Sequence, residues 1–408
     1  GDESRWLRDS DGQNSGAYIF RPSRADEKIT DLPLTETTDI KIFQDELVSE
    51  VHAQYGDWVS QVTRVKKGSP YVEIEWVVGP VPDDDGVGRE VVTKFSTDIE
   101  SGDTFFTDSN GREFLERKLN YRPTWDMEVF QPVAGNYYPV NAAIFVEDDK
   151  SSLAVLPDRT QGGSSLESGN IEIMVQRRTK ADDSRGVAEP LDETTGGVNP
   201  YPPYGDNARV GTGVIIKGTH RIYVGDGNSG AGIARSGMDE MFSPLNVFFS
   251  NAGAVDVEID DHFQVSEFSA VGEIGASPLP DQIALITLQK VYGEEGVFFA
   301  RLAHQYAVGE DDNLSQPAAV DLNSILPKGL KMAGFKEMTL TGNQEFSDRQ
   351  KKKLKWVADD DETLEEAVSG RTFDNGDLVN FKPMEMRSFR IHTVHEDATK
   401  GAVQGWIN

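Results

Sequence analysis

Apolar and polar residues alternate with a period of two along much of this chain, and this pattern restricts the fold to layers of β-sheet. Ile74, Trp76 and Val78 share one side of an extended segment, while Glu73 and Glu75 share the other. Such a segment is typical of a strand with one buried face. The same alternation recurs at residues 171–175 and 298–306.

Other segments add strands to this prediction. Residues 283–288 are apolar almost throughout, which predicts a strand covered on both faces. Asn110-Gly111 and Asn375-Gly376 predict hairpin reversals, because both residue types tolerate positive φ. Apolar residues recur every four positions between 43 and 55, which fits either a helix or two strands, and we favour strands.

Many short strands with few helix signals predict an all-β chain of stacked antiparallel sandwich domains. A shift in composition near residues 256–261 places the boundary between domains 1–260 and 261–408. The glycine-rich segment Gly227–Gly232 lacks the spacing of a dinucleotide-binding loop, since Arg235 stands where a third glycine is needed. A flexible surface turn is therefore expected there.

Charge excludes several classes of partner. The 408 residues include 40 basic and 69 acidic side chains, for a formal charge of −29, which repels phosphate backbones and anionic lipids. No stretch approaches the ~18 consecutive apolar residues of a membrane span. Carboxylates stay substantially ionised near pH ~5, so the composition suits an acidic compartment. The first residues contain neither an initiator Met nor an apolar signal segment, which predicts a processed or shortened end.

The sequence predicts no metal site of its own. It contains no cysteine, and its six histidines do not form a spaced ligand set. His304 shares a strand face with apolar residues, so a hydrogen-bonded core histidine is expected. Asn313-Leu314-Ser315 is an acceptor sequence for N-glycosylation if the protein is secretory, and Asn313 is the predicted attachment point.

Several motifs stand in order along the first half of the chain. They are Ser15 to Pro22, Arg122-Pro123-Thr124-Trp125, Asn136-Tyr137-Tyr138-Pro139-Val140 and Arg177-Arg178 through Asp182-Asp183-Ser184-Arg185-Gly186. Together they resemble the C-terminal half of glycoside hydrolase family 38, the zinc-dependent retaining α-mannosidases of lysosomes and plant vacuoles. The resemblance is strong between residues 100 and 190 and weaker elsewhere.

The resemblance implies a specific division of labour. The fold would comprise a large supersandwich of the galactose-mutarotase-like type and a smaller terminal sandwich. In the family, the zinc ligands and the carboxylate nucleophile lie in an N-terminal α/β domain, of which this sequence shows no trace. The chain would thus be the β-rich portion, or small subunit, of an enzyme that removes terminal α-linked mannose from N-glycans. No catalytic residue and no zinc ligand are expected here, and the isolated chain is predicted to be inactive.

The same resemblance implies the partners and the compartment. The main partner would be the N-terminal catalytic portion or large subunit of the same enzyme, which would bind the zinc. The other ligands would be mannose-containing glycans, with neither nucleic acid nor membrane. A higher oligomer in a lysosome or vacuole is expected, with secretion as a further alternative.

Tyr138 is the predicted substrate-binding residue. Tyr137 and Tyr138 are adjacent on an extended segment, so their side chains point to opposite faces. The family implies that this segment reaches the active site, and position assigns the sugar contact to Tyr138. Packing of both tyrosines at an internal seam is the alternative.

The basic and acidic run at residues 177–185 is predicted to brace the junction with the catalytic half. Three guanidinium groups beside two carboxylates favour bidentate ion pairs and an ordered, salt-bridged turn. The residues assigned to this junction are Arg177, Arg178, Asp182, Asp183 and Arg185.

Two other functions fit the same sequence. Stacked sandwiches with aromatic edges are also found in carbohydrate-binding or adhesion modules without hydrolase activity. A purely structural scaffold with a buried tyrosine pair is the third reading.

Overall fold

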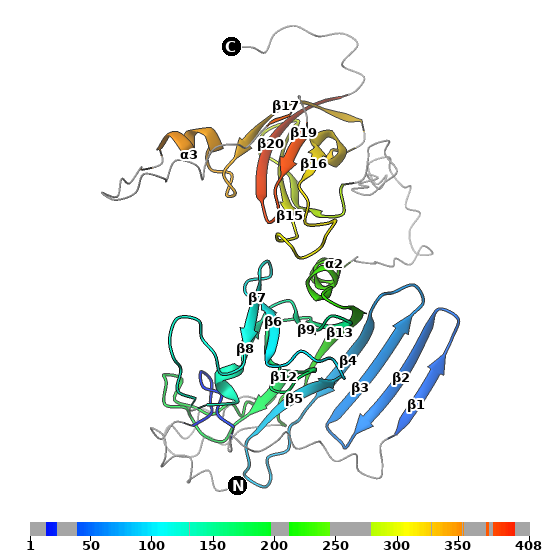
Figure 1. Cartoon of the computed structure of the whole chain (residues 1–408), viewed down its shortest axis with the longest axis vertical. Helices are drawn as coiled ribbons and strands as arrows, with labels where there is room; N and C mark the ends of the chain where they lie inside the picture. Colours follow the sequence, from blue (N-terminus) through cyan, green and yellow to red (C-terminus); the bar gives the residue numbers. More distant parts are fainter. Residues whose placement is uncertain are drawn as a thin grey trace. The chain divides into compact units, whose positions relative to one another are not determined.

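The chain folds into two compact units, Gly1–Leu245 and Asn246–Asn408. Figure 1 shows both units, coloured from the N-terminus to the C-terminus. The domain boundary predicted between residues 260 and 261 lies outside the described residues. The structure, a computed structural model, describes residues 14–22, 39–129, 131–196, 212–244, 279–327, 329–352, 354, 373–374 and 378–395.

Unit 1 contains two antiparallel sheets. The larger has nine strands in the order β1-β2-β3-β4-β13-β10-β9-β6-β7, and the smaller has four in the order β5-β12-β11-β8. The strands and the short helix η1 are β1 Ile40–Gln44, β2 Val48–Tyr55, β3 Val59–Lys66, β4 Val72–Val78, β5 Arg89–Ser96, β6 Thr104–Asp108, β7 Phe114–Lys118, η1 Ala134–Asn136, β8 Tyr138–Val140, β9 Ile144–Glu147, β10 Ser151–Pro157, β11 Gln161–Ser164, β12 Asn170–Arg178 and β13 Ile216–Asp226.

The two sheets of unit 1 share one apolar core. Phe105, Ile144 and Val155 belong to the larger sheet, Val140 and Ile173 to the smaller, and all five side chains are completely buried in one cluster. β9, β10 and β12 contribute alternate residues to this core, as the period-two pattern predicts. The antiparallel β-sandwich predicted from the sequence is confirmed for this unit.

Helix α2, Gly230–Phe242, covers the opposite face of the larger sheet. Ala234 of the helix packs in one cluster with Phe145 of β9 and Leu156 of β10. In Figure 1 the helix lies beside β9 and β13. The larger sheet is therefore covered on both faces over its central strands.

The glycines just before and at the first residue of α2 are needed for close packing. A Cβ atom on Gly227 would lie 2.2 Å from the carbonyl carbon of Asp149, and one on Gly230 would lie 2.4 Å from the ring of Phe145. Glycine at both positions lets the backbone touch the sheet where the helix begins. The predicted flexible surface turn at Gly227–Gly232 is wrong, because its second half is the first turn of a packed helix.

Strands β1 to β4 extend to one side of unit 1, drawn in blue in Figure 1. All five residues of β1, at the edge of the sheet, are exposed, including Ile40 and Ile42. Asp39 and Asp45 flank the strand, and Lys41 forms an ion pair with Asp39 at 3.0 Å. The choice of strands over a helix for residues 43–55 is confirmed by β1 and β2.

Unit 2 is a second, smaller β-structure, with sheets in the orders β14-β15-β20-β17 and β16-β19-β18. Leu302, Phe381 and Phe389 are fully buried in one core. Arg387 is also buried and forms a bidentate pair with Glu337, at 2.8 and 3.1 Å. The elements are β14 Ile283–Lys290, β15 Val297–His304, β16 Ala318–Asp321, η3 Leu322–Ile325, β17 Leu330–Met338, α3 Phe346–Lys352, β18 Phe373–Asp374, β19 Leu378–Phe381 and β20 Met386–His395.

The sequence predicted more complete burial for β14 than for β15, and the structure shows the reverse. β14 was expected to be covered on both faces, yet it is an edge strand with Ile286 52% exposed. β15 was expected to have one buried face, yet seven of its eight residues are buried. β15 lies between two neighbours in its sheet, and its position, not its own pattern, decides the burial. The Asn375-Gly376 turn falls outside the described residues.

The sandwich core gives a direct test of this packing. Ile173→Ala removes a completely buried side chain and should lower the free energy of unfolding by about 2–5 kcal/mol. Ile215→Ala removes the same atoms from a residue that is 55% exposed and should change it by less than about 1 kcal/mol. Urea denaturation of the two variants measures the difference, and equal losses would contradict the described core.

Candidate functional site

Tyr137 and Tyr138 point in opposite directions from the start of β8. The ring of Tyr137 packs against Phe20 at 4.8 Å between ring centroids, and its hydroxyl donates to the carboxylate of Glu172. Burial raises the pKa of Glu172, and burial followed by the charge of Glu172 raises the pKa of Tyr137. Tyr137 is therefore a packed, hydrogen-bonded side chain, as the internal-seam alternative describes.

Tyr138 lies among cations at the other side of the strand. Its ring centroid is 4.3 Å from the guanidinium carbon of Arg117, 5.4 Å from that of Arg122 and 5.8 Å from the ring of Phe105. The side chain is half-buried. Within the described residues its hydroxyl makes no hydrogen bond. The ring is thus occupied by protein contacts, and the hydroxyl is the group it can offer to a ligand.

Asp108 fixes the chain on either side of this tyrosine. Its carboxylate is completely buried and accepts hydrogen bonds from the backbone N–H groups of Asn141, Ala142 and Ala143, at 2.7–3.0 Å. Its second oxygen accepts from Gly111 at 2.7 Å. The residue therefore joins the β6–β7 turn to the segment that leaves β8. The predicted hairpin at Asn110-Gly111 is confirmed as a five-residue turn between Asp108 and Phe114.

The arginines of the 177–185 run form ion pairs with strand β5 and the loop before it. Arg177 makes a bidentate pair with Glu90, at 2.6 and 2.9 Å, and also donates to the carbonyl of Ile19 at 2.8 Å. Arg178 pairs with Asp83 at 2.8 Å. The bidentate geometry was predicted, but these partners lie outside the run, about 90 residues away in sequence.

Asp183 binds backbone N–H groups of the N-terminal segment. Its carboxylate accepts from Tyr18 at 2.6 Å, Ile19 at 3.1 Å and Arg185 at 3.0 Å. Burial acts to raise the pKa of Asp183, and these hydrogen bonds together lower it below the ordinary value. A Cβ atom on Gly16 would lie 2.7 Å from that of Asp183, so glycine is required at this contact.

Asp182 contacts one neighbour in the run and one residue of the N-terminal segment. The carboxylate of Asp182 accepts from the N–H of Ser184 at 3.0 Å, and its carbonyl accepts from Asn14 at 3.3 Å. Residues 14–22 are thus held against β5 and β12. Phe20 of this segment packs against the ring of Tyr137. The assignment of the run to a junction with a catalytic half stays a prediction.

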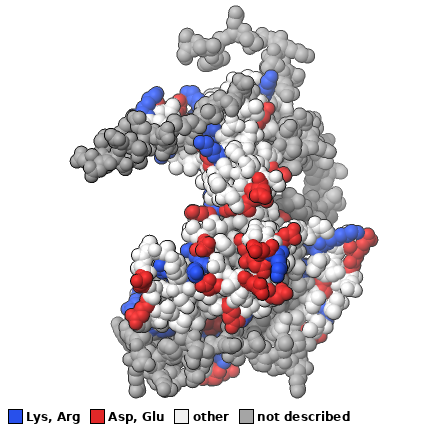
Figure 2. All heavy atoms as spheres, in the orientation of Figure 1, with Lys and Arg blue, Asp and Glu red and all other residues white. Residues whose placement is uncertain are grey.

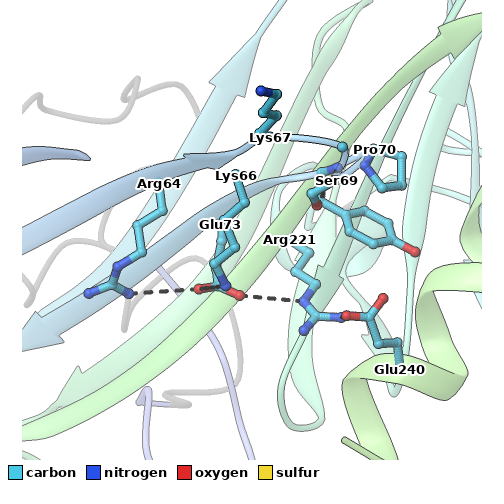
Figure 3. A pocket seen from close by; sticks show the side chains of 10 residues that line it. Arg64, Lys66, Lys67, Ser69, Pro70, Glu73, Arg221 and Glu240 are labelled. Carbon is cyan, nitrogen blue, oxygen red and sulfur yellow. Dashed lines mark hydrogen bonds and ion pairs between the residues drawn. The ribbon is translucent and has the colours of Figure 1, made fainter. Parts of the chain in front are cut away.

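A separate polar pocket of about 370 Å³ lies at the β3–β4 turn. Figure 3 shows Glu73 between Arg64 and Arg221, with Glu240 of α2 beyond Arg221. Glu73 also pairs with Lys66 at 3.2 Å. The cations and carboxylates that line this pocket therefore bind one another. Figure 2 shows acidic and basic groups interspersed on the visible face of unit 1.

His52 and His304 have hydrogen-bond partners other than a metal. His52 contacts Glu50 at 2.8 Å. His304 is completely buried, and its ring nitrogens lie 3.1 and 2.9 Å from the carbonyls of Tyr306 and Gln316, as expected for a core histidine. No group of three or more metal-binding side chains occurs within the ranges that the structure describes. These residues do not fit a zinc ion.

Asn313 lies at an exposed turn in unit 2, and its N–H donates to Asp311 at 2.8 Å. Ser315 of the same acceptor sequence is buried, and its hydroxyl accepts from the N–H of Asp311 at 3.0 Å. The described part of the chain contains no helix long and apolar enough to cross a membrane.

Residues 2–185 match the family model described as "Glycosyl hydrolases family 38 C-terminal domain". The chain belongs to this family. The resemblance recognised from the motifs is thereby confirmed, and so is the all-β fold class, since the described helices are only α2, α3 and two short turns of 3-10 helix.

Relatives of this family 38 chain are α-mannosidases. An α-mannosidase of Arabidopsis thaliana is 40% identical over 94% of the chain, that of Canavalia ensiformis 37% over 94%, and human lysosomal α-mannosidase 37% over 94%. The chain spans 35%, 37% and 35% of those proteins. A crystal structure of an α-mannosidase from Enterococcus faecalis aligns with 87% of the chain and 35% of its own length, with 10% identity and a TM-score of 0.48.

Sequence reasoning found the tyrosines and the 177–185 run but missed Arg117 and Asp108. Arg117 is the middle one of three consecutive charged residues in β7, and no local signal marks its contact with Tyr138. Asp108 precedes the Asn110-Gly111 turn, which is a usual position for a carboxylate that binds turn N–H groups. That signal was available.

Removal of the Asp183 carboxylate should release residues 15–22. Asp183→Ala leaves the N–H groups of Tyr18 and Ile19 without their acceptor, so their amide hydrogen exchange should become at least about 10-fold faster. Asp182→Ala is the matched control, because its carboxylate accepts from Ser184 and not from the segment. Unchanged exchange at Tyr18 in Asp183→Ala would refute the clamp.

His220 makes unit 1 sensitive to acid. The ring is completely buried, Nε2 lies 2.9 Å from Gln161, and Nδ1 has no hydrogen-bond partner among the residues that the structure describes. Burial, opposed by the charge of Asp158, lowers the pKa of His220 from 6.5 to about 4. The neutral ring is therefore favoured in the folded state, and stability is lost as pH falls from 6.5 towards 4.

The expected loss is about 2 kcal/mol at pH ~5 relative to neutral pH. His220→Gln should remove this part of the pH dependence, whereas His52→Gln, at an exposed ring, should keep it. Urea denaturation between about pH 4.5 and 8 measures the effect. An unchanged pH profile in His220→Gln would assign the acid sensitivity to other groups.

Proposed function

We propose that this chain is the C-terminal β portion of a zinc-dependent, retaining α-mannosidase that removes terminal α-linked mannose from N-glycans. The observation that carries the proposal is 36–40% identity to α-mannosidases along 92–94% of the chain. A match this long includes both units and is not confined to one motif. The relatives are roughly three times longer, which supports a companion portion in the complete enzyme.

We assign the catalytic groups to that companion portion of the enzyme. Retaining glycoside hydrolysis uses two carboxyl groups about 5–5.5 Å apart. The pocket in Figure 3 has two, Glu73 and Glu240, and both are paired with Arg221 at 3.7 and 3.3 Å. Since the described residues also lack a zinc ligand set, we place the zinc and both catalytic carboxyl groups in the N-terminal catalytic portion or large subunit.

The contribution of this chain is one wall of the sugar pocket. Tyr138 is held on the sandwich by Phe105 and by two guanidinium groups, so its hydroxyl has a fixed position. A hydroxyl of this kind can donate to or accept from a sugar hydroxyl. The run from Arg177 to Arg185 orders the N-terminal segment at the opposite side of β8 and is proposed to support the contact with the companion.

The compartment proposed is a lysosome or vacuole. Several relatives are named lysosomal α-mannosidases, and the net charge of −29 keeps the surface charged at mildly acidic pH. In such a compartment the exposed Asn313 is the proposed site of N-glycosylation. A higher oligomer with the companion portion is part of the same proposal.

A carbohydrate-binding module without hydrolase activity is the second candidate. The observation that favours it is the pair of solvent-exposed aromatic residues Tyr121 and Trp125, close in sequence to Arg122. Aromatic rings at the edge of a sandwich serve sugar binding whether or not an active site is present.

Measurement of α-mannosidase activity decides between the α-mannosidase portion and the carbohydrate-binding module. The chain expressed alone should not hydrolyse an aryl α-mannoside, and the chain assembled with its catalytic portion should. Within the assembly Tyr138→Phe should lower kcat/KM about 10-fold, the cost of one hydrogen bond. Tyr292→Phe, at a fully exposed residue of unit 2, is the control. Hydrolysis by the pure single chain would overturn the division of roles.

A further inference from the structure

Two guanidinium groups lie beside the ring of one tyrosine in unit 1. The guanidinium carbon of Arg117 is 4.3 Å from the ring centroid of Tyr138, and that of Arg122 is 5.4 Å from the same centroid. Burial lowers the pKa of Arg117 below its ordinary value, and the nearby charge of Arg122 acts in the same direction. Two like charges at one ring are unfavourable unless an anion lies beside them.

Neither arginine forms an ion pair within the ranges that the structure describes. Nε of the half-buried Arg117 donates to the hydroxyl of Thr107 at 3.0 Å, and its terminal nitrogens have no acceptor among the same residues. The guanidinium of Arg122 donates to the carbonyls of Tyr121 and Gly135, at 2.7 and 2.8 Å. Their hydrogen bonds to neutral groups leave both positive charges without a counter-charge in contact.

Other partly buried arginines of unit 1 do pair with carboxylates, namely Arg64, Arg89, Arg177, Arg178 and Arg221. The charge of Asp108 acts on Arg117, but both oxygens of this carboxylate accept from backbone N–H groups. Carboxylates are not scarce, since the chain has 69 acidic and 40 basic side chains. The cations at Tyr138 are therefore an exception that points to a partner outside this chain.

A carboxylate fits these cations better than a neutral ligand does. A guanidinium that lies over an aromatic face keeps its N–H edge for a bidentate pair. The terminal mannose of the proposed substrate is neutral and brings no counter-charge. The chain spans only 35–37% of three α-mannosidases that it resembles, so the larger part of each relative has no counterpart here. That larger part offers a source of acidic side chains.

We propose that Arg117 and Arg122 bind an acidic side chain of the catalytic portion, and that this contact seats the catalytic portion against Tyr138. The inference rests on the proposed function, which supplies both the catalytic portion and the neutral substrate. It adds the chemistry of the contact and its place on the sandwich. Assembly then brings a counter-charge to the two arginines and fixes the Tyr138 ring at the boundary between the two portions.

The dissociation constant between this chain and the catalytic portion tests the contact. Arg117→Gln and Arg122→Gln should each raise it at least about 10-fold, because the carboxylate of the catalytic portion would lose a charged partner. Arg117→Lys keeps the charge and should lose less. Arg159→Gln is the matched control, since Arg159 already pairs with Asp158 at 2.8 Å, and it should leave the constant unchanged. Unchanged constants in both Gln variants at Tyr138 would overturn the proposal.

Urea denaturation of the chain alone separates an interface role from a structural one. Arg117→Gln removes a cation that repels Arg122, so the urea midpoint should stay the same or rise. A lower midpoint in Arg117→Gln, together with an unchanged dissociation constant in Arg122→Gln, would show that Arg117 serves only to hold Tyr138. That result would overturn the proposal.

An acidic glycan is the other source of a negative charge. Calorimetric titration of the full chain with a sialylated oligosaccharide should show no binding. Binding that is lost in Arg117→Gln would assign the two arginines to a glycan and overturn the protein contact. If the assembled wild-type enzyme forms but does not hydrolyse an aryl α-mannoside, the proposed function fails while the dissociation constants still decide the contact.

Discussion

The surroundings of Tyr138 depend on one buried carboxylate. Asp108 accepts four backbone hydrogen bonds, three from residues 141–143 and one from Gly111. Without it, four N–H groups near the core would lose their acceptor, and each such loss costs about 1–3 kcal/mol. The same residue ends β6, whose Phe105 packs against Tyr138. A polar interaction inside an apolar sandwich thereby sets the position of a residue at its edge.

Local sequence patterns predicted local structure well. Alternation predicted β4 and β12, and the adjacent tyrosines do diverge to opposite sides of β8. Contacts between distant segments were not predictable in this way. Glu90 and Arg177 are 87 residues apart, and Tyr18 and Asp183 are 165 residues apart. Such pairs are created by the sheet order, and the reversed burial of β14 and β15 has the same origin.

The proposed function relates this β-rich chain to the chemistry of its family. The sandwich supplies rigid supports, and Tyr138 at the start of β8 is the side chain that we propose contacts a sugar. Tyr138 and Arg122, whose guanidinium carbon is 5.4 Å from the Tyr138 ring centroid, both lie between β7 and the end of β8. In the proposed function, a β portion of this kind would shape what reaches an active site without containing the reacting groups. Variation in one segment can then alter substrate choice with little effect on the core.

The exposed strand β1 has a consequence for handling the protein. A sheet that ends in a strand with Ile40 and Ile42 exposed offers a template for the backbone of another molecule. Asp39, Lys41 and Asp45 discourage such pairing while they are charged. High salt screens these charges. Concentrated samples are therefore best kept at low to moderate salt, where intermolecular strand pairing is least favoured.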